Sequence, residues 1–319
     1  MINIALENYD FGKNGKNCCI FKNTINTIYN MIPSKFNYHK ATSVQDAIAL
    51  SQEYGEDAKY MSGGHSLLPM MKLRFANPEH IIDISKIQGL SYIKEDGDHL
   101  KIGAMTTQTE MEYSPLIKEK YSIFSDAIKL TADPSVRNVG TIGGNIAHGD
   151  AANDQPALML AMRATIIAEG VDGQKSIPID EFFHGFYMTA LEPSDVLIEI
   201  QVPKTKKGNG GAYHKVERKV GDYATAGVAV HVEIDEDGVC QEVGIGLTNV
   251  SAVPMRLDRG EALLKGKKIT EDLIAQVGSI ASEDCEPTSD LRGSEAYKRS
   301  IVKTITQRMI RLAMERAQH

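Results

Sequence analysis

The sequence lacks the cysteine pattern of a metal-binding or cluster-binding protein. Its four cysteines form no CxxC pair and no ordered ladder of spacings, which argues against a zinc site or an iron–sulfur cluster on this chain. His148 and Asp150 stand two residues apart but lack a third and a fourth ligand, so no metal site is expected there either. We expect reduced thiols, as in the cytoplasm. The cysteines are Cys18, Cys19, Cys240 and Cys285.

Long apolar runs and an excess of basic residues are also absent. No stretch approaches the roughly 20 apolar residues that span a bilayer, and the N-terminus lacks the basic start and apolar core of a signal peptide. The net charge of -7 and the pI near 5.8 give no general attraction to nucleic acid or anionic lipid. We therefore expect a cytoplasmic protein with neither of those partners.

The composition is that of an ordered globular protein. Hydrophobic residues make up 42% and charged residues 24% of the 319 residues, and this length predicts two or three packed units. Residues 1–30 are rich in asparagine and have little apolar periodicity. We interpret them as an N-terminal extension, with the functional start near Met31; an ordinary N-terminal arm is the alternative.

Patterns along the chain predict mixed α and β structure. A helix is expected from Thr42 to Gly55, with Thr42-x-x-Gln45 as a capping box. Lys206–Gly211 is polar and glycine-rich, as in a linker or loop. Further helices are expected at 156–162 and around 301–313, and strands at 59–61, 81–84, 91–95, 99–103, 165–168, 196–202, 226–234 and 239–247.

Two Gly-Gly pairs, Gly63-Gly64 and Gly143-Gly144, lie between predicted elements and are followed by polar side chains. Glycine can adopt positive φ and bring successive backbone N–H groups against phosphate oxygens. One pair alone usually marks only a tight turn, but two such turns could hold a diphosphate from both sides. No GxGxxG follows a strand and opens a helix, and no GxxxxGK[ST] occurs. A dinucleotide fold other than the Rossmann or P-loop fold is implied.

Three long motifs carry a resemblance to a known family. They are SGGHSLLPMMKLR at 62–74, VRNVGTIGGNIA at 136–147 and DLRGSEAYKR at 290–299. From about Met31 to its end, the chain resembles the FAD-binding medium subunits of carbon monoxide dehydrogenases and the related flavin domains of xanthine dehydrogenases and aldehyde oxidoreductases, which are molybdenum hydroxylases.

The resemblance implies an α+β fold in two parts. The first is a FAD-binding domain of the family that includes vanillyl-alcohol oxidase-like flavoproteins, at 31–207, with subdomains at about 31–86 and 87–207. The second is a small C-terminal domain with an antiparallel sheet and helices, at 208–319. FAD would lie extended across their junction.

The resemblance also implies which residues bind FAD. Both glycine segments would enclose the pyrophosphate, and Asp154 would hydrogen-bond a sugar or ribityl hydroxyl. From the residues alone, Asp154 has the alternative role of a helix N-cap before Pro156. The candidates from these segments are Ser62, Gly63, Gly64, His65, Ser66, Leu67, Thr141, Ile142, Gly143, Gly144, Asn145 and Asp154.

A further stretch, 213–224, matches the part of the relatives that lies beside the isoalloxazine ring. Tyr223 is the candidate neighbour of the ring, where an aromatic side chain can shield one flavin face; packing at a domain seam is its alternative. Lys215 is a second candidate, although His214 occupies the position of the flavin-side lysine in xanthine dehydrogenases. Leu197 would pack either on the ring or in the core.

The resemblance implies an electron-transfer role. Substrate would be hydroxylated at a molybdopterin cofactor on a large subunit, electrons would pass through iron–sulfur clusters on a small subunit, and FAD on this chain would deliver them to an external acceptor. Flavin suits this position because it exchanges one or two electrons. The chain would need no catalytic acid or base, and FAD would be its only redox centre. A two-fold assembly of three-chain units, a heterohexamer, is expected.

Two other functions remain open at this point. One is a stand-alone FAD-dependent oxidase or dehydrogenase with its own substrate pocket, although such enzymes usually add a large cap domain. The other is a non-redox scaffold that has lost FAD, against which the intact glycine pairs argue. The resemblance also leaves open the acceptor and the substrate, which could be carbon monoxide, an aldehyde, a purine or an aromatic acid.

Overall fold

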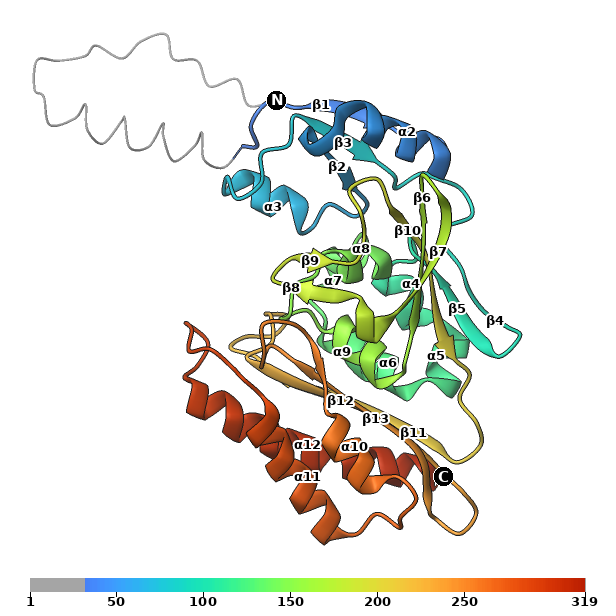
Figure 1. The fold of residues 1–319 in the computed structure, drawn as a ribbon, viewed down its shortest axis with the longest axis vertical. Helices are drawn as coiled ribbons and strands as arrows, with labels where there is room; N and C mark the ends of the chain where they lie inside the picture. Colours follow the sequence, from blue (N-terminus) through green and yellow to red (C-terminus); the bar gives the residue numbers. More distant parts are fainter. Residues whose placement is uncertain (1–31, 319) are drawn as a thin grey trace, which may run out of the picture.

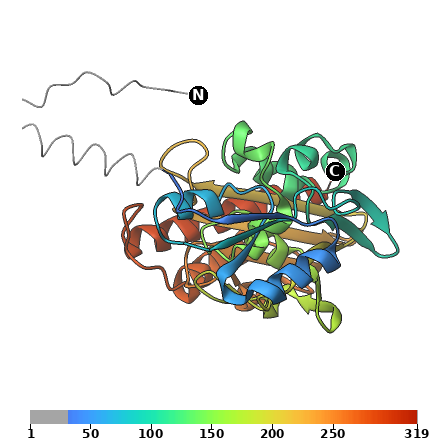
Figure 2. The ribbon, with the colours of Figure 1, turned by 90° about the horizontal axis from the view of Figure 1, so that it is seen from above.

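The computed structural model describes residues 32–318. They form three units stacked along the long axis of the molecule, each built around its own β-sheet (Figure 1). Figure 2 looks along this axis onto the first unit. Helices and strands are mixed throughout, which confirms the predicted α+β class. The predicted extension at 1–30, with Cys18 and Cys19, lies outside the described residues. The limits 31–86, 87–207 and 208–319 remain our proposal.

The first unit is a parallel sheet of order β1-β3-β2, with Ala47 and Ile48 of α2 packed over Ile82 of β3. The helix before the first glycine pair was thus predicted, but the short α3 behind that pair was not. The elements are β1 (Asn37–Lys40), α2 (Val44–Tyr54), the 3-10 helix η1 (Gly55–Asp57), β2 (Ala58–Met61), α3 (Leu67–Lys72) and β3 (His80–Asp83).

The predicted capping box of α2 is wrong by one residue. Ser43 is the N-cap, and its hydroxyl accepts a hydrogen bond from the Asp46 backbone N–H at 3.0 Å. The Thr42 N–H instead donates to the Asp46 carboxylate at 2.8 Å. Ser43, with φ of -147°, has the extended backbone that lets a cap hydroxyl reach the first helical turn.

The second unit is an antiparallel sheet of order β4-β5-β10-β6-β7, with helices covering its inner face. Leu100, Ile102, Ile166 and Ile200 of this sheet are fully buried against those helices. The elements are β4 (Ile93–Asp96), β5 (His99–Gly103), α4 (Gln108–Tyr113), α5 (Pro115–Lys120), α6 (Ser122–Leu130), α7 (Pro134–Arg137), α8 (Ile142–Ala147), α9 (Gln155–Ala161), β6 (Thr165–Gly170), β7 (Gly173–Pro178), η2 (Ile179–Glu181), β8 (Phe183–Gly185), β9 (Met188–Thr189) and β10 (Val196–Pro203).

The third unit is an antiparallel sheet that is covered on both faces. Val228, Val230 and Val232 of β12 pack against the C-terminal helices, whereas Ala229 packs into the core of the second unit. The predicted linker at Lys206–Gly211 is partly wrong, because β11 already begins at Asn209. The elements are β11 (Asn209–Val216), β12 (Ala226–Ile234), β13 (Cys240–Thr248), β14 (Met255–Arg256), α10 (Asp258–Leu264), α11 (Glu271–Asp284) and α12 (Glu295–Ala317).

Glycines in β13 let α9 of the second unit lie directly on this sheet. A Cβ atom at Gly244 would come within 1.9 Å of the Ala161 carbonyl oxygen, and one at Gly246 within 2.0 Å of the Ala157 carbonyl oxygen. Helix backbone and strand backbone are therefore in contact. This contact fixes the start of α9, where Asp154 stands, relative to the strands of the third unit.

His231 of β12 lies at the same seam. It faces a small space lined by Ser122 and Met162, and within the described residues its Nε2 has no hydrogen-bond partner. Burial lowers the pKa of this imidazole to about 4, even though Glu233 opposes the shift. The folded protein therefore holds His231 neutral at moderately acidic pH.

Replacing Gly246 with alanine should destabilise the protein, because the added methyl group would overlap the Ala157 carbonyl. We expect the free energy of unfolding to fall by about 1–3 kcal/mol in urea denaturation. Gly185→Ala is the control, since its Cβ would meet only the Met188 sulfur at an ordinary 3.5 Å. Equal losses in both variants would contradict the contact between α9 and β13.

Stability should fall on acidification through His231. The unfolded chain protonates a histidine near pH 6.5, whereas the folded chain resists until about pH 4, so the unfolded state binds more protons between these values. The free energy of unfolding should therefore drop by at most about 1.4 kcal/mol per pH unit over that window. Urea denaturation at several pH values should show a smaller slope for His231→Phe, and an unchanged slope for the exposed control His184→Asn.

Candidate cofactor-binding site

A cleft of about 630 Å³ opens among the three units. Its walls come from segments that are far apart in the chain. The first unit contributes the end of β2 and the start of α3, the second contributes the segments around α8 and α9 and the start of β10, and the third contributes the loop at 221–223.

The first glycine segment follows β2 and leads into α3. Gly64 has a φ of 71°, so this pair does form the predicted turn. Gly63 has ordinary φ, but a Cβ there would come within 2.3 Å of the Val139 carbonyl oxygen. Gly63 is thus required by a close backbone contact and Gly64 by its conformation.

The second glycine pair is not a turn, which corrects the prediction. Gly143 and Gly144 lie inside α8, whose N-cap Thr141 accepts a hydrogen bond from the Gly144 N–H at 3.1 Å. A Cβ at Gly143 would come within 2.6 Å of the Ala104 Cβ. The pair is needed because α8 is pressed against the end of β5, and not because of positive φ.

The two glycine segments touch each other directly. The Thr141 hydroxyl donates to the Ser62 hydroxyl at 3.1 Å, and a Cβ at Gly144 would come within 2.5 Å of the same Ser62 oxygen. Two glycine segments that stand 79 positions apart in sequence therefore form one continuous wall.

Most of the predicted site residues line this cleft. Two do not: Ile142 is fully buried in the core of the second unit, and Lys215 lies behind the wall. His65 is the exposed member of the first segment, and Leu197 stands at a register shift between β10 and β6. The residues that line the cleft are Ser62, Gly63, Gly64, His65, Ser66, Leu67, Thr141, Gly143, Gly144, Asn145, Asp154, Leu197 and Tyr223.

Asp154 occupies the N-cap position of α9, as its alternative role expects, but it does not act as a cap. Its backbone is helical, and its side chain makes no capping hydrogen bond. The carboxylate instead accepts hydrogen bonds from the Tyr213 hydroxyl at 2.5 Å and from Lys215 Nζ at 3.0 Å. Burial raises the pKa of Asp154, and Lys215 and Tyr213 oppose this shift. The hydrogen bond from Asp154 to a cofactor hydroxyl stays a prediction.

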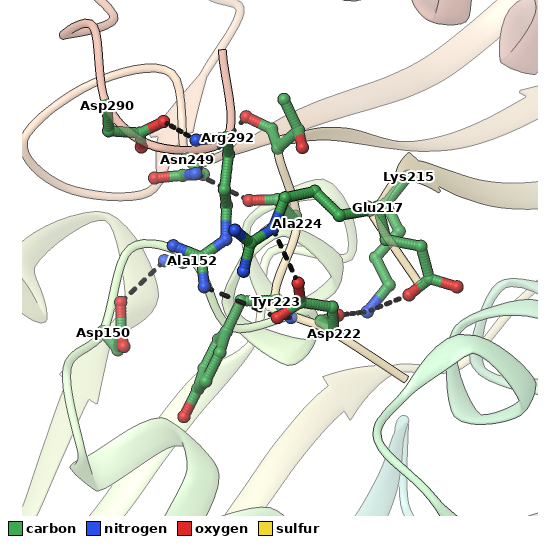
Figure 3. A network of polar contacts seen from close by, with 12 residues as sticks. Asp150, Ala152, Lys215, Glu217, Asp222, Tyr223, Ala224, Asn249, Asp290 and Arg292 are labelled. Atoms are coloured by element: carbon green, nitrogen blue, oxygen red, sulfur yellow. Dashed lines mark hydrogen bonds and ion pairs between the residues drawn. The ribbon is translucent and has the colours of Figure 1, made fainter. Parts of the chain in front are cut away.

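Lys215 joins the wall to the loop that carries Tyr223 (Figure 3). Its side chain is 1% exposed, and Nζ contacts Asp154, the Asp222 carbonyl oxygen at 2.7 Å and the Glu217 carboxylate at 3.4 Å. The Asp222 carboxylate accepts from Arg218 at 3.1 Å. Lys215 Nζ thus has three oxygen partners, of which two are carboxylates and one is a backbone carbonyl.

Of two aromatic residues beside the cleft, one was predicted from the sequence and the other was not. Tyr223, which was predicted, is 40% exposed at the third unit's edge of the cleft. Tyr187, which was not, lines the cleft from the loop between β8 and β9 and donates to Asp150 at 3.3 Å. Burial raises the Tyr187 pKa to about 12. Its φ of 56° is unusual for tyrosine, but nothing in the sequence pattern signals it.

Other contacts complete the surroundings of the cleft. The His148 ring lies 4.8 Å from the Tyr187 ring, and burial lowers the His148 pKa. Among residues 32–318, no group of three or more His, Cys, Asp or Glu side chains could hold a metal ion. Cys240 and Cys285 are free and buried. In the same range, no helix has the length and apolar character needed to span a membrane.

Comparisons with known proteins agree with this arrangement. Residues 34–205 match the FAD binding domain in molybdopterin dehydrogenase, and residues 211–313 match the CO dehydrogenase flavoprotein C-terminal domain. The carbon monoxide dehydrogenase medium chain of Hydrogenophaga pseudoflava is 46% identical over 90% of this chain and 99% of its own length. That of Afipia carboxidovorans is 39% identical over 91% of this chain and 100% of its own length.

Comparison with solved structures agrees with these sequence matches. The carbon monoxide dehydrogenase of Hydrogenophaga pseudoflava that lacks the Mo-pyranopterin moiety contains a chain with a TM-score of 0.87 and 46% identity, over 90% of this chain and 99% of that one. The likeness thus extends through both domains and includes all three motifs. This chain therefore belongs to the family of FAD-binding medium chains of molybdopterin dehydrogenases.

Proposed function

We propose that this chain binds FAD in the cleft and transfers electrons as the flavin subunit of a molybdenum hydroxylase complex. One observation carries the proposal: the likeness to medium chains covers 99–100% of their length. The meeting of both glycine segments in the wall of one cleft supports it.

The residues of the cleft fit FAD. Its volume lies within the range of roughly 300–1,000 Å³ that is usual for ligand sites. Where the segments meet, glycines leave backbone exposed and Ser62 and Thr141 bring hydroxyl groups, which suits a pyrophosphate. Leu67, Met70 and Leu197 supply apolar surface for flat rings. The Asn145 Oδ1, which has no partner among the described residues, is a candidate acceptor for cofactor hydroxyls.

We assign different roles to Asp154, Tyr223 and Lys215. Asp154 holds a sugar or ribityl hydroxyl, and Tyr223 shields one face of the flavin ring. Lys215 is too deeply buried to face the cleft, so we infer that it acts through its contacts with Asp154 and Asp222. In this way it holds the carboxylate and the loop in place.

When bound, FAD supplies the redox chemistry, because its ring exchanges one or two electrons. The chain's own residues position the cofactor and leave its ring accessible. Two partners follow from the proposal, a small subunit with iron–sulfur clusters and a large subunit with molybdopterin, together with an external electron acceptor and a cytoplasmic location. The alternative, a stand-alone FAD-dependent oxidase or dehydrogenase, predicts instead that an organic substrate reduces FAD on the isolated chain.

The proposed assembly can be tested by mild purification of the tagged endogenous protein. We expect FAD in the absorbance spectrum, together with an iron–sulfur chain and a molybdopterin chain identified in the same sample. FAD on a solitary chain that an organic substrate reduces would favour the stand-alone enzyme. Assembly without any FAD would support the scaffold.

Gly144→Ala is the matched variant for this experiment. Its methyl group would overlap the Ser62 hydroxyl and separate the two glycine segments, so FAD occupancy should fall at least about tenfold, equivalent to roughly 1.4 kcal/mol. The partner chains should still copurify, as they should with Gly185→Ala, which should retain FAD. Normal FAD content in Gly144→Ala would contradict the proposed binding site.

The buried ion pair gives a separate prediction. Lys215→Met leaves the Asp154 charge without its partner, which should lower the free energy of unfolding by about 3–5 kcal/mol at neutral pH. Adding Asp154→Asn removes that charge and should recover part of the loss, as urea denaturation of the three variants can measure. If the double variant is as unstable as the sum of the single ones, the two side chains are not coupled.

A further inference from the structure

The loop that carries Tyr223 makes few contacts of its own that would fix the position of the tyrosine ring. The loop connects β11 to β12, and its tip residue Val220 is 92% exposed. The backbone N–H of Tyr223 donates only to the adjacent Asp222 side chain, at 2.9 Å. An aromatic side chain that is 40% exposed has rotamer freedom to lose when it takes one position. Contacts from outside the loop, with Ser66 of the first unit and with Arg292, must therefore define where the ring lies.

Arg292, from the loop before α12, meets this requirement (Figure 3). Its guanidinium carbon lies 5.6 Å from the centre of the Tyr223 ring, within the distance of a cation–π contact. The same group forms an ion pair with Asp222 at 3.5 Å. One planar cation therefore contacts two consecutive residues, holding the base of the loop by charge and the ring by its face.

The loop that carries Arg292 is itself anchored. The Asp290 carboxylate accepts hydrogen bonds from the backbone N–H groups of Arg292, at 2.7 Å, and Gly293, at 3.1 Å. It also accepts from Nζ of Lys298 at 2.8 Å, and the Lys298 side chain is 1% exposed in α12. Asp290 thus links the loop that carries the guanidinium to the long C-terminal helix α12.

An ion pair with Asp222 does not by itself explain the position of Arg292. Arg218 already pairs with Asp222 at 3.1 Å, closer than Arg292 does. Within the described residues, the buried Nε of Arg292 has no hydrogen-bond partner, so a hydrogen bond from that donor does not account for the position of the guanidinium near the Tyr223 ring. Burial raises the pKa of both Tyr187 and Tyr223, and the Arg292 charge opposes the shift at each phenol.

We propose that Arg292 is a positioning residue of the flavin site, which fixes the Tyr223 ring in the wall of the cleft. The inference rests on the proposed function for its consequence, because a fixed Tyr223 would set the environment of one flavin face. The contact between Arg292 and Tyr223 is given by the geometry and does not depend on that function. The Asp290–Arg299 motif therefore serves the cleft from a distance, through one side chain.

The test compares Arg292→Met and Arg292→Lys in the complex of the full chain with its partner subunits. Arg292→Met should shift the visible circular dichroism of the flavin and weaken rebinding of FAD to the flavin-stripped complex by about tenfold. Arg292→Lys, which keeps the charge but not the planar guanidinium, should recover only part of this. Arg311→Met, which removes an arginine paired with Glu271 far from the cleft, should match wild type.

A double-mutant cycle identifies the route of the effect. In a Tyr223→Leu background, Arg292→Met should change FAD affinity by less than about twofold, because the residue that it positions is gone. The proposal is overturned if Arg292→Met leaves the flavin spectrum and affinity unchanged, or if its effect is the same with and without Tyr223.

A cofactor-independent readout separates this inference from the proposed function. In the flavin-stripped protein, Arg292→Met should speed tryptic cleavage after Arg218 and Lys219, because the loop loses one of the contacts that anchor it. Unchanged cleavage would overturn the positioning role. If the wild-type complex contains no FAD, the proposed function fails, and the cleavage rates alone decide whether Arg292 holds the loop.

Discussion

The buried ion pair between Asp154 and Lys215 is the interaction on which the arrangement of the cleft depends. Asp154 belongs to the second unit and Lys215 to the third, and each would be costly to bury alone. The pair is possible only because α9 lies against the glycines of β13, which brings the start of the helix to the end of β11. Packing between backbones thus places the charges, and the charges hold the loop that completes the cleft.

In the two glycine segments, glycine mainly allows close packing between parts of the chain, and backbone flexibility matters less. Only Gly64, of the four glycines in the two segments, has positive φ. Gly63, Gly143 and Gly144 are instead fixed by neighbours that leave no room for a methyl group. Such positions are intolerant of substitution even by alanine, whereas a turn glycine tolerates residues such as asparagine. The glycine pairs therefore reflect tertiary contacts between distant parts of the chain.

Sequence patterns predicted the fold best where local physics decides it. The strands around Asp96-Gly97 and Asp237-Gly238 were predicted because apolar alternation and turn residues are both local signals. The helical state of Gly143-Gly144 was not predicted, because Ala104, which holds it, is 39 positions away in the chain. Most of the predicted cleft residues came from the first two motifs, and Asp154, Leu197 and Tyr223 came from other stretches that resemble the family. Tyr187 and the buried state of Lys215 depend instead on contacts between units that no local pattern records.

The site draws on segments from all three units, so synthesis on the ribosome completes it late. Asp154 and Lys215 are separated by 61 positions. At about 5–20 residues per second, Lys215 is therefore synthesised several seconds after Asp154. The support of β11 by α12 comes about 80 to 100 residues later still. A nascent chain can therefore form its first sheet early, while a complete cofactor cleft must await synthesis of α12.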